Sequence, residues 1–476
     1  MPSIPTPHAG RSEADDANFS ASPVPSSVRL GRWQVTMSYW SLLSAMVWLF
    51  YGALAASLYG TRNAIMAIIL SAVVYSVINI FTTRLGIRLG LNSTLLTKTI
   101  FGKWGSALTA LLLAATTLYY AVFESSTLAT AFHLYFGAGD IRIWYAVVVL
   151  AMMPLMLGSV QSWMGKLNGI LLPFYVIGLA AAVIAAYVKF GGDSAWLDSA
   201  GIVPDVARSL PGWLLSMILY LGLFVNMPAT IDFARFAKIE DEKFHERVTF
   251  GWVFYIGLFV VNGIAGIYLV QSVLPNEPAS EVGVVQAILA SIGFFGLLFI
   301  VVSQTRVNSV NYYLSTTNLE RILSTFSSIR LARIFWVSAV SVVVFLLMLT
   351  NVFHYLQTAL NWQGVLVVGW VGVVLTHFAL NVRDRRFGPV IDDAQLPTVG
   401  IGLFAWIVPS LIGIYLLESD SVPALLNQSA QLIVLVLAVV SYVVAHFLTR
   451  RDRSGADGGP VGREVSGDGL STAPQM

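Results

Sequence analysis

Between Ser303 and Ile322 an apolar segment becomes polar, with the sequence SQTRVNSVNYYLSTTNLERI. Amide and hydroxyl side chains recur there at steps of three and four residues, so they share one face of a predicted helix. The apolar run begins near Val284, and we therefore expect the polar stretch to be the inner half of a membrane-spanning helix. Polar groups at that depth could bind a solute or form hydrogen bonds between helices. The residues on this face are Gln304, Asn308, Asn311 and Ser315.

Two charged residues are predicted to lie deep in the membrane. Arg306 is about 14 residues, and hence roughly 20 Å along a helix, from Glu320. A side chain cannot reach the interface over that distance, so the guanidinium must meet water, a carboxylate or carbonyls inside the protein. Glu124 lies about ten residues, roughly 15 Å, from the outer end of its predicted helix. Three roles remain open for Glu124, which could bind a cation, carry a proton or pair with Arg306.

The composition is that of a membrane protein. Hydrophobic residues make up 57% of the chain and charged residues only 11%, which differs from the composition of soluble domains. The absence of cysteine excludes disulfides, thiolate metal sites and cysteine nucleophiles. The sequence has no phosphate-binding glycine loop, no H-E-x-x-H motif and no serine-hydrolase motif. We therefore expect no enzyme activity, no cofactor, no metal site and no nucleic-acid partner.

Twelve apolar runs are long enough to cross a hydrocarbon core of roughly 30 Å. Together they predict an all-α polytopic membrane protein with one transmembrane domain, residues 31–448. The polar ends, residues 1–30 and 449–476, are predicted to be disordered tails. The runs cover residues 34–59, 63–83, 105–134, 143–161, 167–189, 210–234, 249–273, 283–318, 332–352, 362–381, 398–417 and 426–448.

The positions of Lys and Arg predict the orientation. If the N-terminus is cytoplasmic, 22 of the 27 basic residues fall in segments on the inner side. The bias is consistent at every loop, so both termini are expected to be cytoplasmic, in a bacterial plasma membrane. The basic residues on the outer side would be Arg62, Arg142, Lys189 and Arg208.

Two of the predicted helices carry signs of a break. Gly222, Asn226 and Pro228 fall in the middle of run 210–234, where proline removes a backbone donor and clashes with the preceding turn. The freed carbonyls would need a ligand, an ion, water or a neighbouring helix. We expect a discontinuous helix that lines a cavity. In run 34–59, serines before Trp48 permit either a break or an ordinary packed helix.

Three separated segments together resemble the nucleobase–cation symporter-1 family, which includes the purine and cytosine permeases. TIFGKWGSALTALL leads into the third helix, MPATIDFARFAK ends the sixth and NYYLSTTNLERI ends the eighth. The resemblance covers the first ten helices. It implies a leucine-transporter-type fold, with helices 1–5 (about 34–189) and 6–10 (about 210–381) as inverted repeats. Helices 1 and 6 would be broken at the midplane, and helices 11 and 12 (about 398–448) would be additions.

The same resemblance implies a substrate site among helices 1, 3, 6 and 8, with alternating access around it. Aromatic side chains of helices 3 and 6 would sandwich a flat heterocycle, and amides of helix 8 would bond its edge. The matching aromatic residues are Tyr119 and Tyr120, with Tyr220 or Phe224, and the matching amides are Asn308 and Asn311. We add residues expected around the same cavity, which are Ser44, Trp48, Phe123, Glu124 and Asn226.

Two features depart from the family pattern. An ungapped match puts Arg306 and Val307 where sodium-coupled members have a pair of hydroxyls, and a guanidinium there would repel sodium and replace its charge. A slip of one residue would bring Thr305 to that position instead. Glu124 has no counterpart that we can name, and it suggests proton coupling or a positively charged substrate. The predicted ion-coupling residues are therefore Glu124, Arg306 and Thr305.

These observations predict a monomeric symporter that imports a nucleobase or a related small nitrogenous heterocycle, with protons favoured over sodium as the coupling cation. A transporter of a cationic amine or guanidinium-like solute, with Glu124 as counter-charge, is the alternative. A channel or a membrane sensor is the alternative from another class. The predicted broken helices and the lack of a repeated pore loop argue against a channel, and two short tails without a signalling domain argue against a sensor.

Overall fold

The computed structural model describes residues 19, 22–156, 163–192, 194–275, 277, 279–327, 329, 331–350, 352–381 and 396–456. In these residues the regular secondary structure is helical, and the one β-interaction is an isolated bridge between Leu30 and Ala237. The first half contains α1 (Arg32–Tyr39), the 3₁₀ turn η2 (Trp40–Ser44), α2 (Met46–Tyr59), α3 (Thr61–Leu89), α4 (Ser93–Phe136), α5 (Ile141–Met156) and α6 (Gly165–Phe190). The second half contains α7 (Gly212–Leu221), α8 (Asn226–Ala234), α9 (Glu242–Phe244), the π-helix η7 (His245–Thr249), α10 (Trp252–Tyr255), the π-helix η8 (Ile256–Val261), α11 (Asn262–Val273), α12 (Glu281–Ile292), α13 (Phe294–Phe326), α14 (Arg333–Met348), α15 (Val352–Asn381), α16 (Ile401–Glu418), α17 (Ala424–Gln428) and α18 (Ala430–Ala456).

The prediction of an all-α polytopic membrane protein is confirmed. Seven spans among the described residues are long and apolar enough to cross a membrane. Two bent pairs, α1–η2 with α2 and α7 with α8, raise that number to nine. The remaining predicted segments correspond to α5 and α14, which are shorter, and to α13, which carries the polar stretch. Each of the twelve predicted runs therefore corresponds to one helix or to a broken pair of helices where the structure describes it.

One predicted helix is two helices. The run 283–318 divides at Gly293, whose φ of 54° and ψ of −125° end α12 and begin α13. Glycine adopts such a positive φ without the steric cost that a side chain would bring. The uninterrupted apolar composition concealed this break. The polar stretch that begins at Ser303 therefore starts about 15 Å from the beginning of α13, at 1.5 Å per residue. It does not follow a single long apolar helix that begins near Val284.

Some residues that the sequence assigned to the tails contact the bundle or continue its last helix. The Val24 amide donates to the Gly90 carbonyl at 2.9 Å, and Arg29 donates to the carbonyls of Ile87 and Ala237 at 2.6 and 3.1 Å. These bonds fasten the segment before α1 to the ends of α3 and α8, because the last carbonyls of a helix need donors from outside it. Helix α18 likewise continues to Ala456. Residues 1–18, 20–21 and 457–476 of the predicted tails lie outside the described residues.

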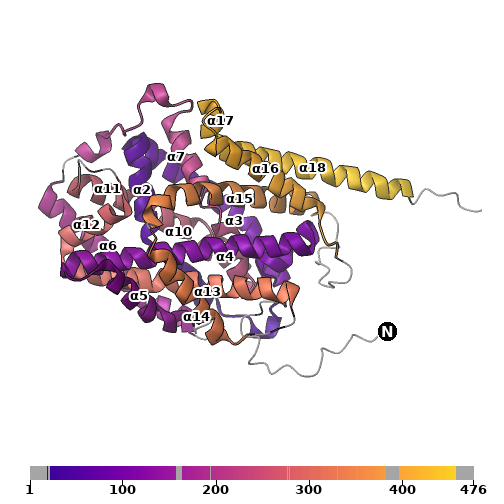
Figure 1. The fold of residues 1–476 in the computed structure, drawn as a ribbon, viewed down its shortest axis with the longest axis horizontal. Helices are drawn as coiled ribbons and strands as arrows, with labels where there is room; N and C mark the ends of the chain where they lie inside the picture. Colours follow the sequence, from indigo (N-terminus) through magenta and orange to yellow (C-terminus); the bar gives the residue numbers. More distant parts are fainter. Residues whose placement is uncertain are drawn as a thin grey trace, which may run out of the picture.

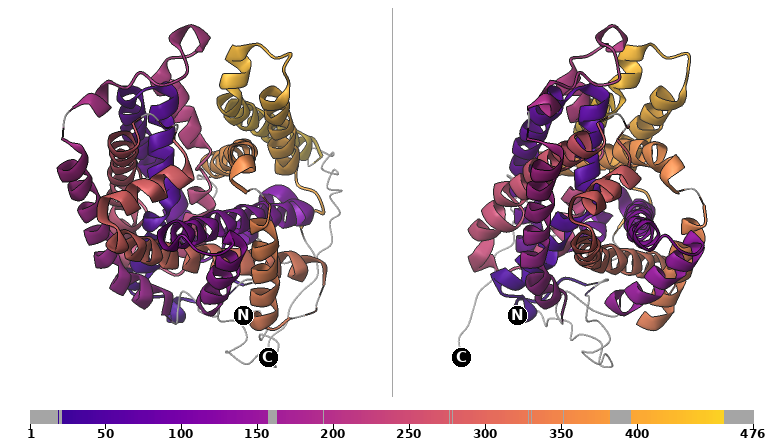
Figure 2. Two further views of the ribbon diagram at one scale, coloured as in Figure 1. Left: turned by 60° about the vertical axis from the view of Figure 1, so that its left-hand side comes forward. Right: turned by 90° about the vertical axis from the view of Figure 1, so that its left-hand side faces the viewer.

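The helices pack so that the two bent pairs lie at the centre. Helix α4 packs along α13, and α2 packs along α11, with Gly52 so close to Gly263 that a Cβ atom on Gly52 would lie 2.2 Å from the Gly263 carbonyl oxygen. Helices α15, α16 and α18 pack on one another along one side of the molecule (Figures 1 and 2). The last helices therefore flank the bundle rather than surround its centre.

Candidate functional site

The first broken helix turns between Ser44 and Met46, and we call this turn the first break. The 3₁₀ turn η2 ends at Ser44, Ala45 is extended with φ −62° and ψ 132°, and the two halves are inclined at 45°. The break leaves carbonyls on one side and amides on the other without partners in the helix. Neighbouring helices provide donors for the carbonyls: Asn262 bonds the carbonyl of Leu43 at 2.7 Å, and Ser303 bonds that of Ser44.

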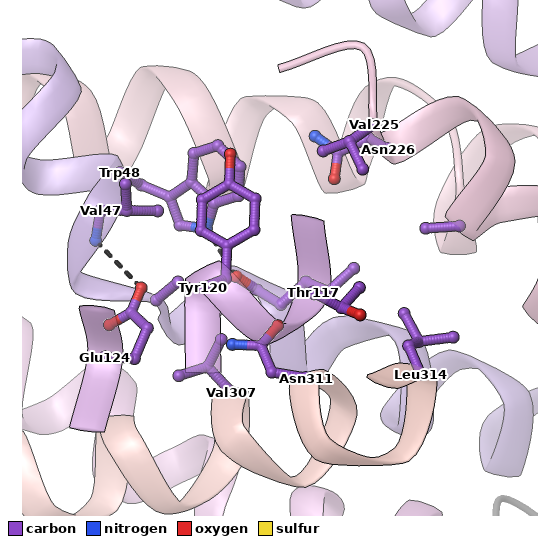
Figure 3. Close-up of a pocket in the computed structure, with 13 residues that line it drawn as sticks. Val47, Trp48, Thr117, Tyr120, Glu124, Val225, Asn226, Val307, Asn311 and Leu314 are labelled. Carbon is purple, nitrogen blue, oxygen red and sulfur yellow. Dashed lines mark hydrogen bonds between the residues drawn. The ribbon is translucent and has the colours of Figure 1, made fainter. Parts of the chain in front are cut away.

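The carboxylate of Glu124 lies at the amide side of the first break. It accepts hydrogen bonds from the backbone amide of Met46 at 3.2 Å and from that of Val47 at 3.4 Å, the second of which is drawn in Figure 3. These are the first two residues of α2, where the free amides and the helix dipole favour a negative group. The buried acid of α4 is therefore held by the start of the second half of helix 1.

The guanidinium of Arg306 lies at the carbonyl side of the same break. Its Nη2 donates to the carbonyl of Trp40 at 2.8 Å, its Nε donates to Oγ of Ser44 at 3.2 Å, and its Nη1 donates to the carbonyl of Asn168 in α6. The side chain has no exposed surface. Free carbonyls at a helix C-terminus carry a partial negative charge, so the polypeptide itself stabilises this buried cation.

Glu124 and Arg306 do not form an ion pair. Among the described residues no salt bridge includes either side chain, whereas Arg321 and Asp232 form a buried pair at 3.2 Å. Pairing with Arg306, one of the three roles that the sequence left open for Glu124, is thus not what the structure shows. Each charge instead faces the end of a half-helix that carries the opposite partial charge.

The second break, Gly222–Val225, separates α7 from α8 and confirms the predicted discontinuity in helix 6. The two halves are inclined at 42°. Tyr75 donates to the carbonyl of Tyr220, and Gln363 in α15 donates to the carbonyl of Gly222 at 3.2 Å. Side chains from two other helices therefore satisfy the carbonyls that this break exposes, as the apolar surroundings require.

A central cavity of about 40 Å³ lies between the two breaks (Figure 3). Within the described part of the chain, Nδ2 of Asn226 and Nδ2 of Asn311 are buried at this cavity without a hydrogen-bond partner. Buried donors are nearly always bonded in proteins, so two such groups beside a carboxylate mark a place for a polar ligand. The cavity is lined by Leu42, Ala45, Val47, Trp48, Thr117, Tyr120, Glu124, Val225, Asn226, Ala229, Val307, Asn311 and Leu314.

The structure brings some of the eleven predicted substrate residues to the central cavity and leaves others away from it. Those that line it are Trp48, Tyr120, Glu124, Asn226 and Asn311. Tyr220 and Phe224 do not line it, because their rings pack against Phe259 at 5.1 Å and Tyr75 at 4.9 Å. The Asn308 amide instead donates to Ser125 on α4 at 3.3 Å.

The remaining predicted residues lie near the central cavity but do not line it. Phe123 is buried, Tyr119 is partly buried beside Tyr120, and Ser44 takes part in the Arg306 site. Of the three residues predicted for ion coupling, Glu124 lines the cavity, Arg306 is fully buried at the first break, and Thr305 is only partly buried.

Several residues at or around the central cavity and the first break were not predicted. Thr117 lies on the same helix face as Tyr120 and Glu124, at steps of three and four residues, and this spacing could have identified it. Asn168 contributes only its backbone carbonyl to Arg306, and no side-chain pattern could have indicated that contact. Gln363 donates to the Tyr120 hydroxyl at 3.1 Å from α15, a helix that no sequence pattern connected with the site.

Comparisons with known proteins agree with this architecture. Mhp1, a nucleobase-cation-symport-1 family transporter, superposes in its inward-facing conformation with a TM-score of 0.69 at 18% identity, over 94% of this chain and 98% of that one. Its closed conformation with bromovinylhydantoin gives 0.68 at 17% identity, over 91% and 96%. A manganese transporter of Eremococcus coleocola gives 0.57 at 16% identity, over 92% and 99%. At these identities the similarity shows the leucine-transporter-type fold alone.

The family to which the chain belongs is shown by its sequence rather than by the structural similarity. No curated protein matches the chain. A family model, described as permease for cytosine/purines, uracil, thiamine, allantoin, matches residues 23–388, which include both breaks and the central cavity. The match confirms the resemblance found in the three sequence segments. The chain therefore belongs to the family of permeases for cytosine/purines, uracil, thiamine and allantoin.

Proposed function

We propose that this protein imports a nucleobase or a related small nitrogenous heterocycle by sodium-independent symport. It acts as a monomer with both termini in the cytoplasm. The observation that carries the proposal is that one carboxylate residue and two residues with unpartnered amide groups line the central cavity between two broken helices. Transporters of this architecture bind their substrates at such breaks near the bilayer midplane.

The polar groups of the central cavity suit the edge of a heterocycle. Glu124 accepts a hydrogen bond from a ring N–H, and the amide groups of Asn226 and Asn311 donate to ring nitrogens or carbonyl oxygens. Trp48 and Tyr120 line the same cavity and offer aromatic surfaces for a flat ring. The cavity has room for about three water molecules, at about 10–15 Å³ each. Substrate binding therefore requires its walls to move apart, as alternating access demands.

Arg306 supports sodium independence. Its guanidinium bonds the carbonyl of Trp40 and the hydroxyl of Ser44, between helices 1 and 8, where the family resemblance implies the sodium ion of sodium-coupled members. Two unit charges 4 Å apart repel by about 4 kcal/mol at an effective dielectric constant of about 20. That repulsion disfavours a second cation. Glu124, which can gain and lose a proton, is then the carrier of the coupling proton.

Uptake into proteoliposomes tests the proposal. Radiolabelled cytosine, uracil, hypoxanthine and allantoin are supplied under a proton gradient, a sodium gradient or neither. We expect accumulation of at least one compound with an inward proton gradient, and no stimulation by sodium. Accumulation driven by sodium alone would remove the argument from Arg306. If none of the heterocycles accumulated and a compound of another chemical class did, the proposed substrate class would be wrong.

A cationic amine or guanidinium-like solute is the second candidate, because among the described residues no basic side chain forms a salt bridge with Glu124. A substrate cation would provide that counter-charge. Thermal-shift measurements on purified protein compare the same heterocycles with guanidine and small amines, since only a ligand of the folded state raises the melting temperature. A shift with the amines and none with the heterocycles would favour the second candidate.

A further inference from the structure

A second and much larger cavity lies against the first broken helix, on the side away from the central cavity. We call it the lateral groove. It has a volume of about 1120 Å³, and its walls come from η2, α6, the loop that follows α6, and the continuous run of α10, η8 and α11. Trp40 and Leu43 of η2 form its inner wall. The lateral groove and the central cavity therefore contact the same 3₁₀ turn from different sides.

The mouth of the lateral groove is apolar and faces outward. Val176 and Ile184 on α6 are 55% and 62% exposed, and Ile256 and Val261 on the opposite wall are 43% and 49% exposed. In a protein that spans a membrane, apolar side chains exposed on this scale meet lipid. The groove is thus open to the hydrocarbon of the bilayer rather than to water.

The deep wall of the lateral groove offers few sites for water. The Tyr175 hydroxyl donates to Asn262 at 2.7 Å, Asn262 donates to the Leu43 carbonyl at 2.7 Å, and the Trp40 indole donates to the Thr249 carbonyl at 3.1 Å. A buried water needs two to four polar partners, and each occupies about 30 Å³ in the liquid. These side chains already bond the protein, so hydrocarbon is the better filling.

The dimensions and the ends of the lateral groove indicate which hydrocarbon. Leu172 and Tyr187 both line it, and fifteen residues of one helix correspond to about 22 Å. One leaflet contributes about 15 Å of a hydrocarbon core of about 30 Å. The groove is therefore long enough to hold an acyl chain that crosses one leaflet. The end near Tyr187 also has Trp196, and Tyr and Trp concentrate where the membrane meets water.

We propose that the lateral groove binds one phospholipid, with its headgroup near Tyr187 and Trp196 and one acyl chain extending inward to Trp40 and Leu43. This proposal does not depend on which solute the protein transports. The end of the acyl chain packs against the turn η2, whose carbonyls accept hydrogen bonds from Arg306 and Asn262. The lipid thereby supports the first break from the side opposite the central cavity.

Native mass spectrometry of detergent-purified protein tests the binding. Ala180, which lines the groove, is replaced in Ala180→Trp, and the exposed Ile177, one turn away on the same helix and outside the groove lining, is replaced in Ile177→Trp. We expect wild type and Ile177→Trp to retain one phospholipid that Ala180→Trp loses. Equal retention in all three proteins, or no retained lipid, would overturn the proposal.

A measurement on the wild-type protein guards against failure of Ala180→Trp to fold. Phosphatidylglycerol with two 16-carbon chains or two 6-carbon chains is added to delipidated protein, and the melting temperature is followed. A chain that must reach Trp40 predicts a rise with the long-chain lipid of several degrees and little or none with the short-chain lipid. Equal shifts with both lipids would mean that the headgroup alone binds, which contradicts an acyl chain in the groove.

Discussion

The two sides of the first break hold opposite charges in different ways. Arg306 donates to three acceptors of the protein and has no exposed surface. Glu124 accepts from two backbone amides but also lines the central cavity beside Asn226 and Asn311, whose amide nitrogens lack partners. A buried charge with all its bonds made within the protein is suited to hold a structure together. A buried charge beside unpartnered donors is suited to exchange its bonds for those of a ligand.

The broken helix also explains why Glu124 and Arg306 can be buried without forming an ion pair with each other. A broken helix presents free amides at one end and free carbonyls at the other, equivalent to about half an elementary charge of each sign. Glu124 faces the first and Arg306 faces the second. Both charges can therefore be buried without a direct ion pair, and movement of the two half-helices would change the environment of both at once.

The largest effect is expected at the carbonyl side. Replacing Arg306 by Leu leaves two carbonyls and a hydroxyl without their donor, and hydrogen bonds to charged groups contribute about 1.5–3 kcal/mol each. We expect a loss of at least about 3 kcal/mol of folding free energy, seen as a lower melting temperature. Uptake should fall with it. Lys should not restore stability, because one ammonium cannot reproduce the planar fork.

Thr305→Val provides the matched control, since Thr305 is the neighbouring position and only partly buried. We expect its melting temperature and its uptake to remain close to those of wild type. If Thr305→Val abolished uptake while Arg306→Leu retained it, the alternative alignment would hold and Thr305 would be the coupling position.

The second prediction concerns the cavity side. Glu124→Gln keeps the size of the side chain but weakens the bonds to Met46 and Val47 and removes the titrating group. A loss of about 2 kcal/mol in binding corresponds to roughly 30-fold, and we expect uptake to lose its dependence on the proton gradient. Thr127→Val is the control on the same helix, because the Thr127 hydroxyl bonds its own backbone at Phe123. Proton-driven uptake that persists in Glu124→Gln would remove this carboxylate from coupling.

The sequence predicted the helices well and the contacts between them poorly, for physical reasons. Gly222 and Pro228 indicate the second break, because proline removes a backbone donor and clashes with the preceding turn. The first break contains no proline or glycine and was predicted only through the family resemblance. Periodicity put Asn308 and Asn311 on one face, but a three-residue step still leaves about 60° between them. Which of the two faces the cavity depends on how α13 packs against α4, and no local pattern contains that information.

The amides of α13 give a third, smaller effect. Asn311 lines the central cavity with an unpartnered amide, whereas Asn308 donates to Ser125. One hydrogen bond to a ligand contributes about 1 kcal/mol, so we expect Asn311→Ala to raise the substrate Kd about five-fold. Asn308→Ala should change it by less than about two-fold. Binding titrations on the two variants check this, and a reversed order would mean that the substrate edge meets Asn308.

The smallest effect distinguishes the aromatic surfaces. The family resemblance assigned one face of the substrate sandwich to helix 6, yet the Phe224 ring packs against Tyr75, and Tyr120 and Trp48 line the central cavity. Ring contacts contribute about 0.5–1.5 kcal/mol beyond burial. Tyr120→Leu should therefore weaken binding by a few-fold, and Phe224→Leu should leave Kd unchanged while lowering the melting temperature. If Phe224→Leu weakened binding instead, its ring must turn into the cavity when the substrate binds, and the second break would then contribute to recognition as well as to the fold.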